Sequence, residues 1–401
     1  MKLLFYPLNQ HFAATAAGLY AIFTSKLQRI FLAFLFSVYS MLAEAQTVVP
    51  FTSDRWHLLE LKQPADSQAY VLETYLGKPA IRLLRTNGQL TRALLKDADF
   101  TNGIIEYDAA FPPDRGGVGM YFRMQDSANY EWFYIRPHQS GNPDATQYIP
   151  IFQGSDCWQL YHGPGYSAPV RFAFNEWVHF KFVISGSQME VFVGDMEKPA
   201  LFVPKLKRTV QPGMLALMGK ARFANFSYTP VANPPIKSVA PAPAPVPAGI
   251  IKEWQVANTF PEKKLEKVLR LTPAQKTGLT WQKMSAEETG ILNLATGPAM
   301  TEENNTTFAR LVIESDRAQV KTLQLGFSDR ARVFLNDQVL YSGRDEFQSR
   351  DYRFLGTVGL FDEVYLPLKK GRNELWVAVS ETFGGWGIKA ALADRTGINV
   401  H

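Results

Sequence analysis

The sequence has little cysteine and little histidine. Cys157 is the one cysteine in 401 residues, which excludes a disulfide framework and any metal site or redox pair that needs two cysteines. The six histidines are scattered without His-x-x-x-His spacing, and no Gly-x-Ser-x-Gly segment occurs. These absences argue against a zinc hydrolase and against a serine hydrolase with a nucleophile elbow.

Excess charge of one sign is also scarce. The chain has 42 Lys and Arg against 37 Asp and Glu, a formal net charge of +5. Two of these positive charges belong to the first 45 residues, which contain Lys2, Lys26, Arg29 and Glu44. The remaining excess is too small to indicate a nucleic-acid partner.

A long apolar run is missing as well. The apolar run at 30–42 is shorter than the ~20 residues of a membrane-spanning helix. Lys26 and Arg29 precede it, and Ala43-Glu44-Ala45 follows as a small-x-small cleavage site. Residues 1–45 are therefore predicted to be a long secretory leader. A second apolar patch at 12–24 leaves a two-helix membrane anchor as the alternative.

The leader predicts a cellular location. No cysteine stands at the cleavage site to accept a lipid. Export with a single cysteine suits a bacterial cell better than a small secreted eukaryotic domain. We therefore expect a secreted or periplasmic bacterial protein that has no membrane attachment after signal cleavage and is a monomer.

Proline is concentrated in one stretch, which predicts the domain boundary. Residues 231–249 contain mostly Ala, Val and Pro, and no packed element tolerates that proline density. We expect a semi-rigid linker over 231–249, with polyproline II character. It separates a first domain, 46–230, from a second domain, 250–401.

Both domains show the period-two alternation of β-strands. In the first, 105–111 and 178–184 alternate apolar with polar side chains, and in the second, 331–335 and 364–368 do the same. No long stretch keeps the helical period. Many short strands separated by turn residues predict an all-β protein of two β-sandwich, jelly-roll domains.

Several segments carry a family resemblance. The first domain resembles the concanavalin A-like superfamily, and within it laminin G-like and 3-keto-disaccharide hydrolase-type domains. It does so through Gly103-Ile104-Ile105-Glu106-Tyr107-Asp108, Gly117-Val118-Gly119-Met120-Tyr121-Phe122-Arg123, Glu176-Trp177-Val178-His179-Phe180 and Ala224-Asn225-Phe226. The second resembles a galactose-binding-like jelly roll through Val333-Phe334-Leu335-Asn336-Asp337, the segment 366–375 and Gly384-Gly385-Trp386-Gly387. The resemblance implies carbohydrate binding or carbohydrate processing.

The segment 130–159 combines the side chains that sugars need. Ring faces of sugars pack on aromatic side chains, and their hydroxyls need planar polar partners. The predicted ligand contacts, in a concave groove of the first domain, are Arg123, Tyr134, Arg136, His138, Asp144, Gln147 and Trp158. The alternative is that the rings belong to the sandwich core and that the loop residues make turns.

An enzyme needs a general acid together with a base or a nucleophile. Glu106 and Asp108 are two apart on a predicted strand and therefore project from the same face. They resemble the start of the Glu-x-Asp-x-x-Glu signature of family sixteen glycoside hydrolases, but Ala110 and Phe111 stand where a further carboxylate belongs. Catalysis would place Glu106, Asp108, Glu131 or His138 beside the groove.

For both the cofactor and the function, the sequence leaves alternatives open. No cofactor is indicated with certainty; Ca²⁺ is a candidate, with Asp126, Asp195 and Glu197 as loop ligands, although no EF-hand loop is present. The favoured hypothesis is a non-catalytic module that binds an oligo- or polysaccharide. A hydrolase or lyase that cleaves glycosides is the first alternative, and a structural cell-surface module is the second.

Overall fold

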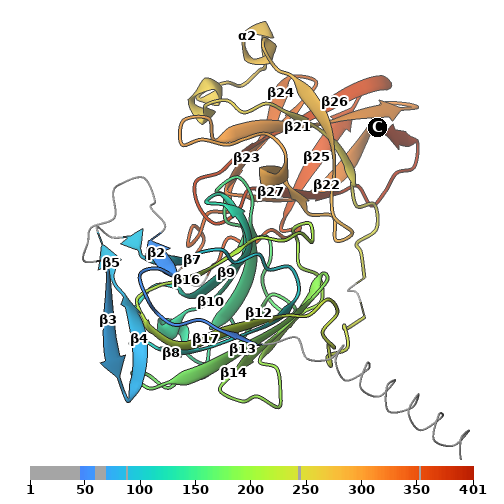
Figure 1. Ribbon diagram of the computed structural model, residues 1–401. Coiled ribbons are helices and arrows are strands. Elements are labelled where there is room, and N and C mark those ends of the chain that lie inside the picture. Colours follow the sequence, from blue (N-terminus) through green and yellow to red (C-terminus); the bar gives the residue numbers. More distant parts are fainter. Residues whose placement is uncertain (1–45, 59–68, 87–88, 243–244, 352–353) are drawn as a thin grey trace, which may run out of the picture. The chain divides into compact units, whose positions relative to one another are not determined.

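The part of the chain seen in the computed structural model is built almost entirely from antiparallel strands (Figure 1). It comprises residues 46–58, 69–86, 89–242, 245–351 and 354–401, so the predicted leader lies outside the described residues. Within these ranges, no helix is long and apolar enough to cross a membrane. The predicted all-β sandwich fold is confirmed.

Two sheets form the N-terminal sandwich. Sheet A contains, in spatial order, β15 (Leu201–Val203), β14 (Gln188–Val193), β13 (Val178–Ser185), β8 (Gly103–Ala110), β17 (Arg222–Pro230), β4 (Lys78–Leu83) and β3 (Tyr70–Tyr75). Sheet B contains β12 (Ser167–Ala168), β11 (Thr146–Ile151), β10 (Asn129–Ile135), β9 (Val118–Asp126), β16 (Met214–Met218), β7 (Arg92–Leu95) and β2 (Trp56–Leu58). Neighbouring strands in the spatial order are often distant in sequence, as in a jelly roll.

Two further sheets form the C-terminal sandwich. Sheet C contains β19 (Trp281–Ser285), β18 (Glu253–Ala257), β21 (Thr306–Ser315), β26 (Gly371–Ser380), β23 (Arg330–Leu335) and β24 (Gln338–Arg344), and β28 (Ile398–Val400) also pairs with β21. Sheet D contains β20 (Leu292–Asn293), β27 (Gly387–Ala391), β22 (Gln319–Ser328) and β25 (Asp362–Leu368). The remaining elements are short: β1 (Thr47–Val48), β5 (Arg85–Thr86), β6 (Gln89–Leu90), η1 (Pro137–Gln139), η2 (Glu262–Leu265), α2 (Pro273–Lys276) and η3 (Leu294–Thr296).

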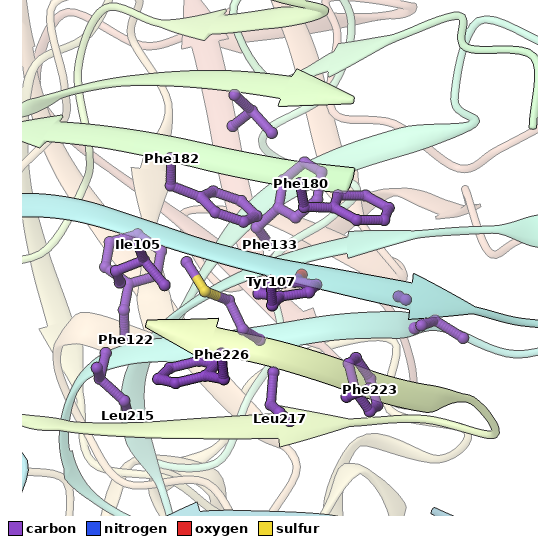
Figure 2. Packing of buried hydrophobic residues seen from close by; sticks show 14 of the residues in the cluster. Ile105, Tyr107, Phe122, Phe133, Phe180, Phe182, Leu215, Leu217, Phe223 and Phe226 are labelled. Atoms are coloured by element: carbon purple, nitrogen blue, oxygen red, sulfur yellow. The ribbon is translucent and has the colours of Figure 1, made fainter. Parts of the chain in front are cut away.

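Each sandwich has its own apolar core. Figure 2 shows the core between sheets A and B, in which aromatic rings from β8, β9, β10, β13 and β17 pack together. In the C-terminal sandwich, Trp386 is completely buried and its indole Nε1 donates to the Val379 carbonyl at 3.0 Å. Val48–His401 packs as one unit, and the domain boundaries at 230 and 250 stay a prediction.

Candidate functional site

Strand β10 places three aromatic rings on the outward face of sheet B. Because strand side chains alternate between the two faces, Phe133 and Ile135 enter the sandwich core, whereas Tyr130 and Tyr134 join a separate cluster outside it. Trp132 packs against that outer cluster, with its ring centroid 4.4 Å from that of Tyr134. The alternation in the sequence therefore gathers these rings on one face.

Much of this outward face is covered. Tyr134 is 5% exposed and Trp158 is 8% exposed, so an open groove over these two rings is not present. Leu355 packs against the cluster, and the Trp158 ring lies 5.8 Å from Phe347 and 5.9 Å from Phe383. Trp132 remains half-exposed. A ligand would therefore meet the margin of the cluster rather than its centre.

A chain of hydrogen bonds connects four of the predicted ligand residues. Arg136 Nη2 donates to the Tyr134 hydroxyl at 2.7 Å, and this hydroxyl donates to Gln147 Oε1 at 3.1 Å. Gln147 Nε2 then donates to the Trp158 carbonyl at 3.2 Å. The guanidinium of Arg136 also lies 4.8 Å from the centroid of the Tyr134 ring. Both the oxygen and the nitrogen of the Gln147 amide make hydrogen bonds in this chain, and Gln147 is buried. It therefore orients Tyr134 and does not contact a ligand itself.

Asp144 and His138 stand at the edge of the same group. Arg136 Nη1 donates to the Asp144 carbonyl at 2.9 Å, and its distance to Asp144 Oδ2 is 3.7 Å. His138 lies in η1, half-exposed, and burial together with the charges of Arg115 and Arg136 lowers its pKa. His138 is consequently neutral at pH 7, when it can both donate and accept a hydrogen bond.

Asp156 adds a carboxyl group that the sequence did not single out. Burial raises its pKa to about 6, Asp329 acts in the same direction and Arg136 opposes them. Besides burial, the charge of Asp156 also raises the pKa values of Tyr130 and Tyr134. Asp156 is half-exposed and makes no hydrogen bond with the described residues. We call Trp132, Tyr134, Arg136, Asp156 and Trp158 the sheet B cluster.

Arg123 and Glu131 lie away from this cluster. Arg123 is 1% exposed, and its Nε donates to the Thr101 carbonyl at 2.8 Å. A β-bulge, marked by φ of 48° at Arg123, turns the side chain out of the alternation of β9. Glu131 follows the inward face of β10 and accepts a hydrogen bond from the Tyr148 hydroxyl at 2.6 Å. Neither side chain reaches a ligand on the outward face, which contradicts the predicted roles.

Glu106 and Asp108 also lie elsewhere, on the outward face of sheet A. The residues between and beside them, Ile105 and Tyr107, enter the core. Asp108 accepts hydrogen bonds from Lys78, His179 and Asn225, each at 2.7 Å. Of the four residues that catalysis would place beside the aromatic groove, these two lie on the other sheet, because alternation gives the face of a strand but not its sheet.

The electrostatics of this second group are those of an ion-pair network. Burial raises the pKa of Asp108, but the hydrogen bonds from His179, Lys78 and Asn225 outweigh it and lower the pKa to about 2. Hydrogen bonds to Asp108 and Glu106 raise the pKa of His179 to about 9. At pH 7 the carboxylate is ionised and the imidazole protonated. Asp108 therefore holds no proton to give to a leaving group.

The candidate calcium ligands act as turn caps. Asp126 Oδ1 accepts from the Ala128 N–H at 2.7 Å, and Asp195 Oδ1 accepts from the Glu197 N–H at 2.8 Å. Across the ranges that the structure describes, no group of three or more His, Cys, Asp or Glu side chains has an arrangement that holds a metal ion. The Ca²⁺ prediction has no cluster to support it.

Comparison with known proteins gives likenesses among solved structures. No family model matches the chain, and no curated protein matches it. Carbohydrate binding module CBM66 from Bacillus subtilis is 14% identical with a TM-score of 0.30, and the match covers 46% of this chain and 100% of that one. A protein of unknown function with a galectin-like fold, also from Bacillus subtilis, is 9% identical with a TM-score of 0.34, covering 47% and 96%. Bacillus licheniformis β-glucanase is 10% identical with a TM-score of 0.32, covering 47% and 98%.

Proposed function

We propose that this protein binds an oligosaccharide at the exposed margin of the sheet B cluster. The observation that carries the proposal is the half-exposed Trp132, which stands beside the rings of Tyr134 and Tyr121, next to the guanidinium that Tyr134 holds, that of Arg136. Its indole Nε1 is shielded from water and has no hydrogen-bond partner in the described chain.

The chemistry of the cluster suits a sugar. An aromatic surface accepts the apolar face of a pyranose ring, while a carboxyl and a guanidinium bind pairs of hydroxyls. Arg136 is already held by Tyr134 and by Asp144, so it loses little conformational freedom when a ligand binds. Phe347, 42% exposed, and Phe383, 55% exposed, extend the apolar surface beyond Trp158.

Replacement of Trp132 by alanine is expected to weaken oligosaccharide binding about tenfold or more, because a stacked ring contributes on the order of 1.4 kcal/mol. Retention on immobilised plant and microbial polysaccharides, followed by titration with the oligosaccharide that is retained, measures the effect. Trp177→Ala is the matched control. Trp177 is half-exposed, has an unpartnered indole nitrogen and stands next to Tyr75, away from the cluster. Equal losses in the two variants would reject the site.

A second candidate function, cleavage of a glycosidic bond, is favoured by Asp156 alone. A general acid must hold a proton near the working pH, and the pKa of Asp156 is raised to about 6. In this function Asp156 gives its proton to the glycosidic oxygen as the C–O bond breaks, and water supplies the hydroxyl to the sugar carbon while its remaining proton returns to the Asp156 carboxylate. Asp329, whose charge raises the pKa of Asp156, is itself buried and accepts hydrogen bonds from the N–H groups of Thr382 and Phe383 at 2.8 and 3.1 Å, so it supports Asp156 electrostatically and does not contact the ligand.

Cleavage makes its own prediction about pH. With a pKa of about 6 for the acid, product release at pH 5 should exceed that at pH 8 about 100-fold, because only the protonated form acts. Chromatography of the retained glycan after incubation gives the rate. Asp156→Asn should abolish release while retention persists. Retention without any release from the unaltered protein would leave binding as the whole function.

The cellular setting remains a proposal that rests on the leader. We propose export from a bacterial cell, and a first domain of concanavalin A-like type followed by a galactose-binding-like one. Export is consistent with the composition, because Cys157, which is buried, is the only cysteine. A polysaccharide ligand is also most accessible outside the cytoplasm.

A further inference from the structure

A cavity of about 780 Å³ lies in the C-terminal sandwich, away from the sheet B cluster. Its volume is in the range of small-ligand sites, which is roughly 300–1,000 Å³. Residues of β18, β19 and β28 line it, together with Arg395. Nothing in the proposed function of the N-terminal sandwich uses this cavity.

The cavity lies between β18 and β28, which pair with different parts of the same edge of β21. Arg310 of β21 pairs with Gln255 of β18, and farther along Ile313 pairs with Val400 of β28. The two strands share one edge of β21 and leave between them the space that Trp254 and Val400 line. Because the walls are strands, the space is formed before any ligand arrives.

Trp281 supplies the accessible aromatic surface of the cavity, and Trp254 is a buried part of its wall. Trp254 is 1% exposed, and its buried indole Nε1 has no hydrogen-bond partner within the described ranges. Trp281 is half-exposed, with the Arg310 guanidinium 4.0 Å from its ring centroid and the Trp376 ring centroid at 4.9 Å. These contacts fix the Trp281 ring, so it is ready to accept the face of a sugar.

Basic side chains outnumber acidic ones along the cavity, with Lys252, Lys283 and Arg395 against Glu253. Lys252 and Arg395 both line the cavity and are exposed, and neither makes an ion pair with the residues that the structure describes. Arg395 Nη2 instead donates to the carbonyls of Gly249 and Ile250, at 3.0 and 3.2 Å, which holds the guanidinium at the rim. Lys283 is paired with Glu253 at 2.9 Å. Two cations therefore remain without a counter-charge.

We propose that this cavity is a second saccharide site, one that takes an acidic oligosaccharide whose sugar rings carry carboxylates. A ring face lies on Trp281, the carboxylates face Lys252 and Arg395, and the amide of Gln282 serves the hydroxyls. Neutral sugars lack the group that the two cations attract. Binding at this cavity does not depend on the sheet B cluster.

Titration of the full chain with trigalacturonate tests this site. We expect saturable binding by the unaltered protein, and about tenfold weaker binding by Lys252→Glu, because the carboxylates then face a like charge. Lys369→Glu is the matched control, since Lys369 is an exposed lysine of the same sandwich that does not line the cavity. The methyl ester of trigalacturonate should bind at least tenfold more weakly than the free acid.

The outcomes separate the two sites. Trp132→Ala should leave trigalacturonate binding unchanged, and Trp281→Ala should reduce it. Absence of saturable binding, equal affinities of the two lysine variants, or equal affinities for acid and ester would overturn the inference. Loss of trigalacturonate binding in Trp132→Ala would place the acidic sugar on sheet B and would also overturn it. Failure of neutral glycans to bind would affect only the proposal for sheet B.

Discussion

Replacing Arg123 by alanine should lower the free energy of unfolding by about 4 kcal/mol. The substitution leaves buried polar groups without the hydrogen bonds that the guanidinium now makes to them. Arg123 Nε donates to the Thr101 carbonyl at 2.8 Å, and Nη2 donates to Asn102 Oδ1 at 2.9 Å and to the Gly186 carbonyl at 2.7 Å. The side chain thus ties β9 of sheet B to the turn between β13 and β14 of sheet A. The two sheets of the sandwich lose this connection in the variant.

A buried charge makes the loss larger. The charge of Glu131 acts on Arg123, and Glu131 is itself completely buried beside Tyr148. Without the guanidinium, that carboxyl group is left with fewer compensating partners. Urea unfolding followed by circular dichroism gives the change. Arg115→Ala, at an exposed position, is the control and should change stability by less than about 0.5 kcal/mol. A loss below about 1 kcal/mol in Arg123→Ala would contradict this role.

Two substitutions of Tyr107 should have different effects on stability. Its ring lies at the centre of the first core, with centroids of Phe180, Phe182 and Phe223 at 5.2, 5.7 and 5.7 Å (Figure 2). Tyr107→Ala removes these contacts and leaves a cavity, which costs about 3–5 kcal/mol of unfolding free energy. Tyr107 is 1% exposed, so water could fill the space left by the ring only by entering the apolar core.

Tyr107→Phe is expected to be neutral or to stabilise by up to about 1 kcal/mol. The Tyr107 hydroxyl is buried and has no hydrogen-bond partner among the described residues, and burial raises its pKa far above the ordinary value. Removing an unsatisfied hydroxyl while keeping the ring therefore costs nothing. Thermal and urea unfolding of both variants measure the difference. Destabilisation by Tyr107→Phe would show that the hydroxyl is bound after all.

The fold was predictable because it depends on local pattern. Alternation over 105–111 and 178–184 indicated strands whose apolar residues form a core, and β8 and β13 have this arrangement. The same period placed Tyr130, Trp132 and Tyr134 on one face. Such patterns report the two faces of a strand directly, since successive side chains point in opposite directions.

The site was predictable only in part, because it depends on long-range pairing. Glu106 and Asp108 share a face, but which sheet carries them is decided by the pairing of β8 with β13 and β17. Arg123 left its expected face through a bulge. Phe347 and Phe383 reach Trp158 from positions about 200 residues later in the chain, and no local pattern marks such a contact.

Diffraction from a crystal soaked with the retained oligosaccharide tests the central claim most directly. Electron density for a sugar ring is expected against Trp132, with its hydroxyls within hydrogen-bonding distance of Asp156 or Arg136. Density for the same neutral sugar only on another surface, with the margin of the sheet B cluster empty, would contradict it.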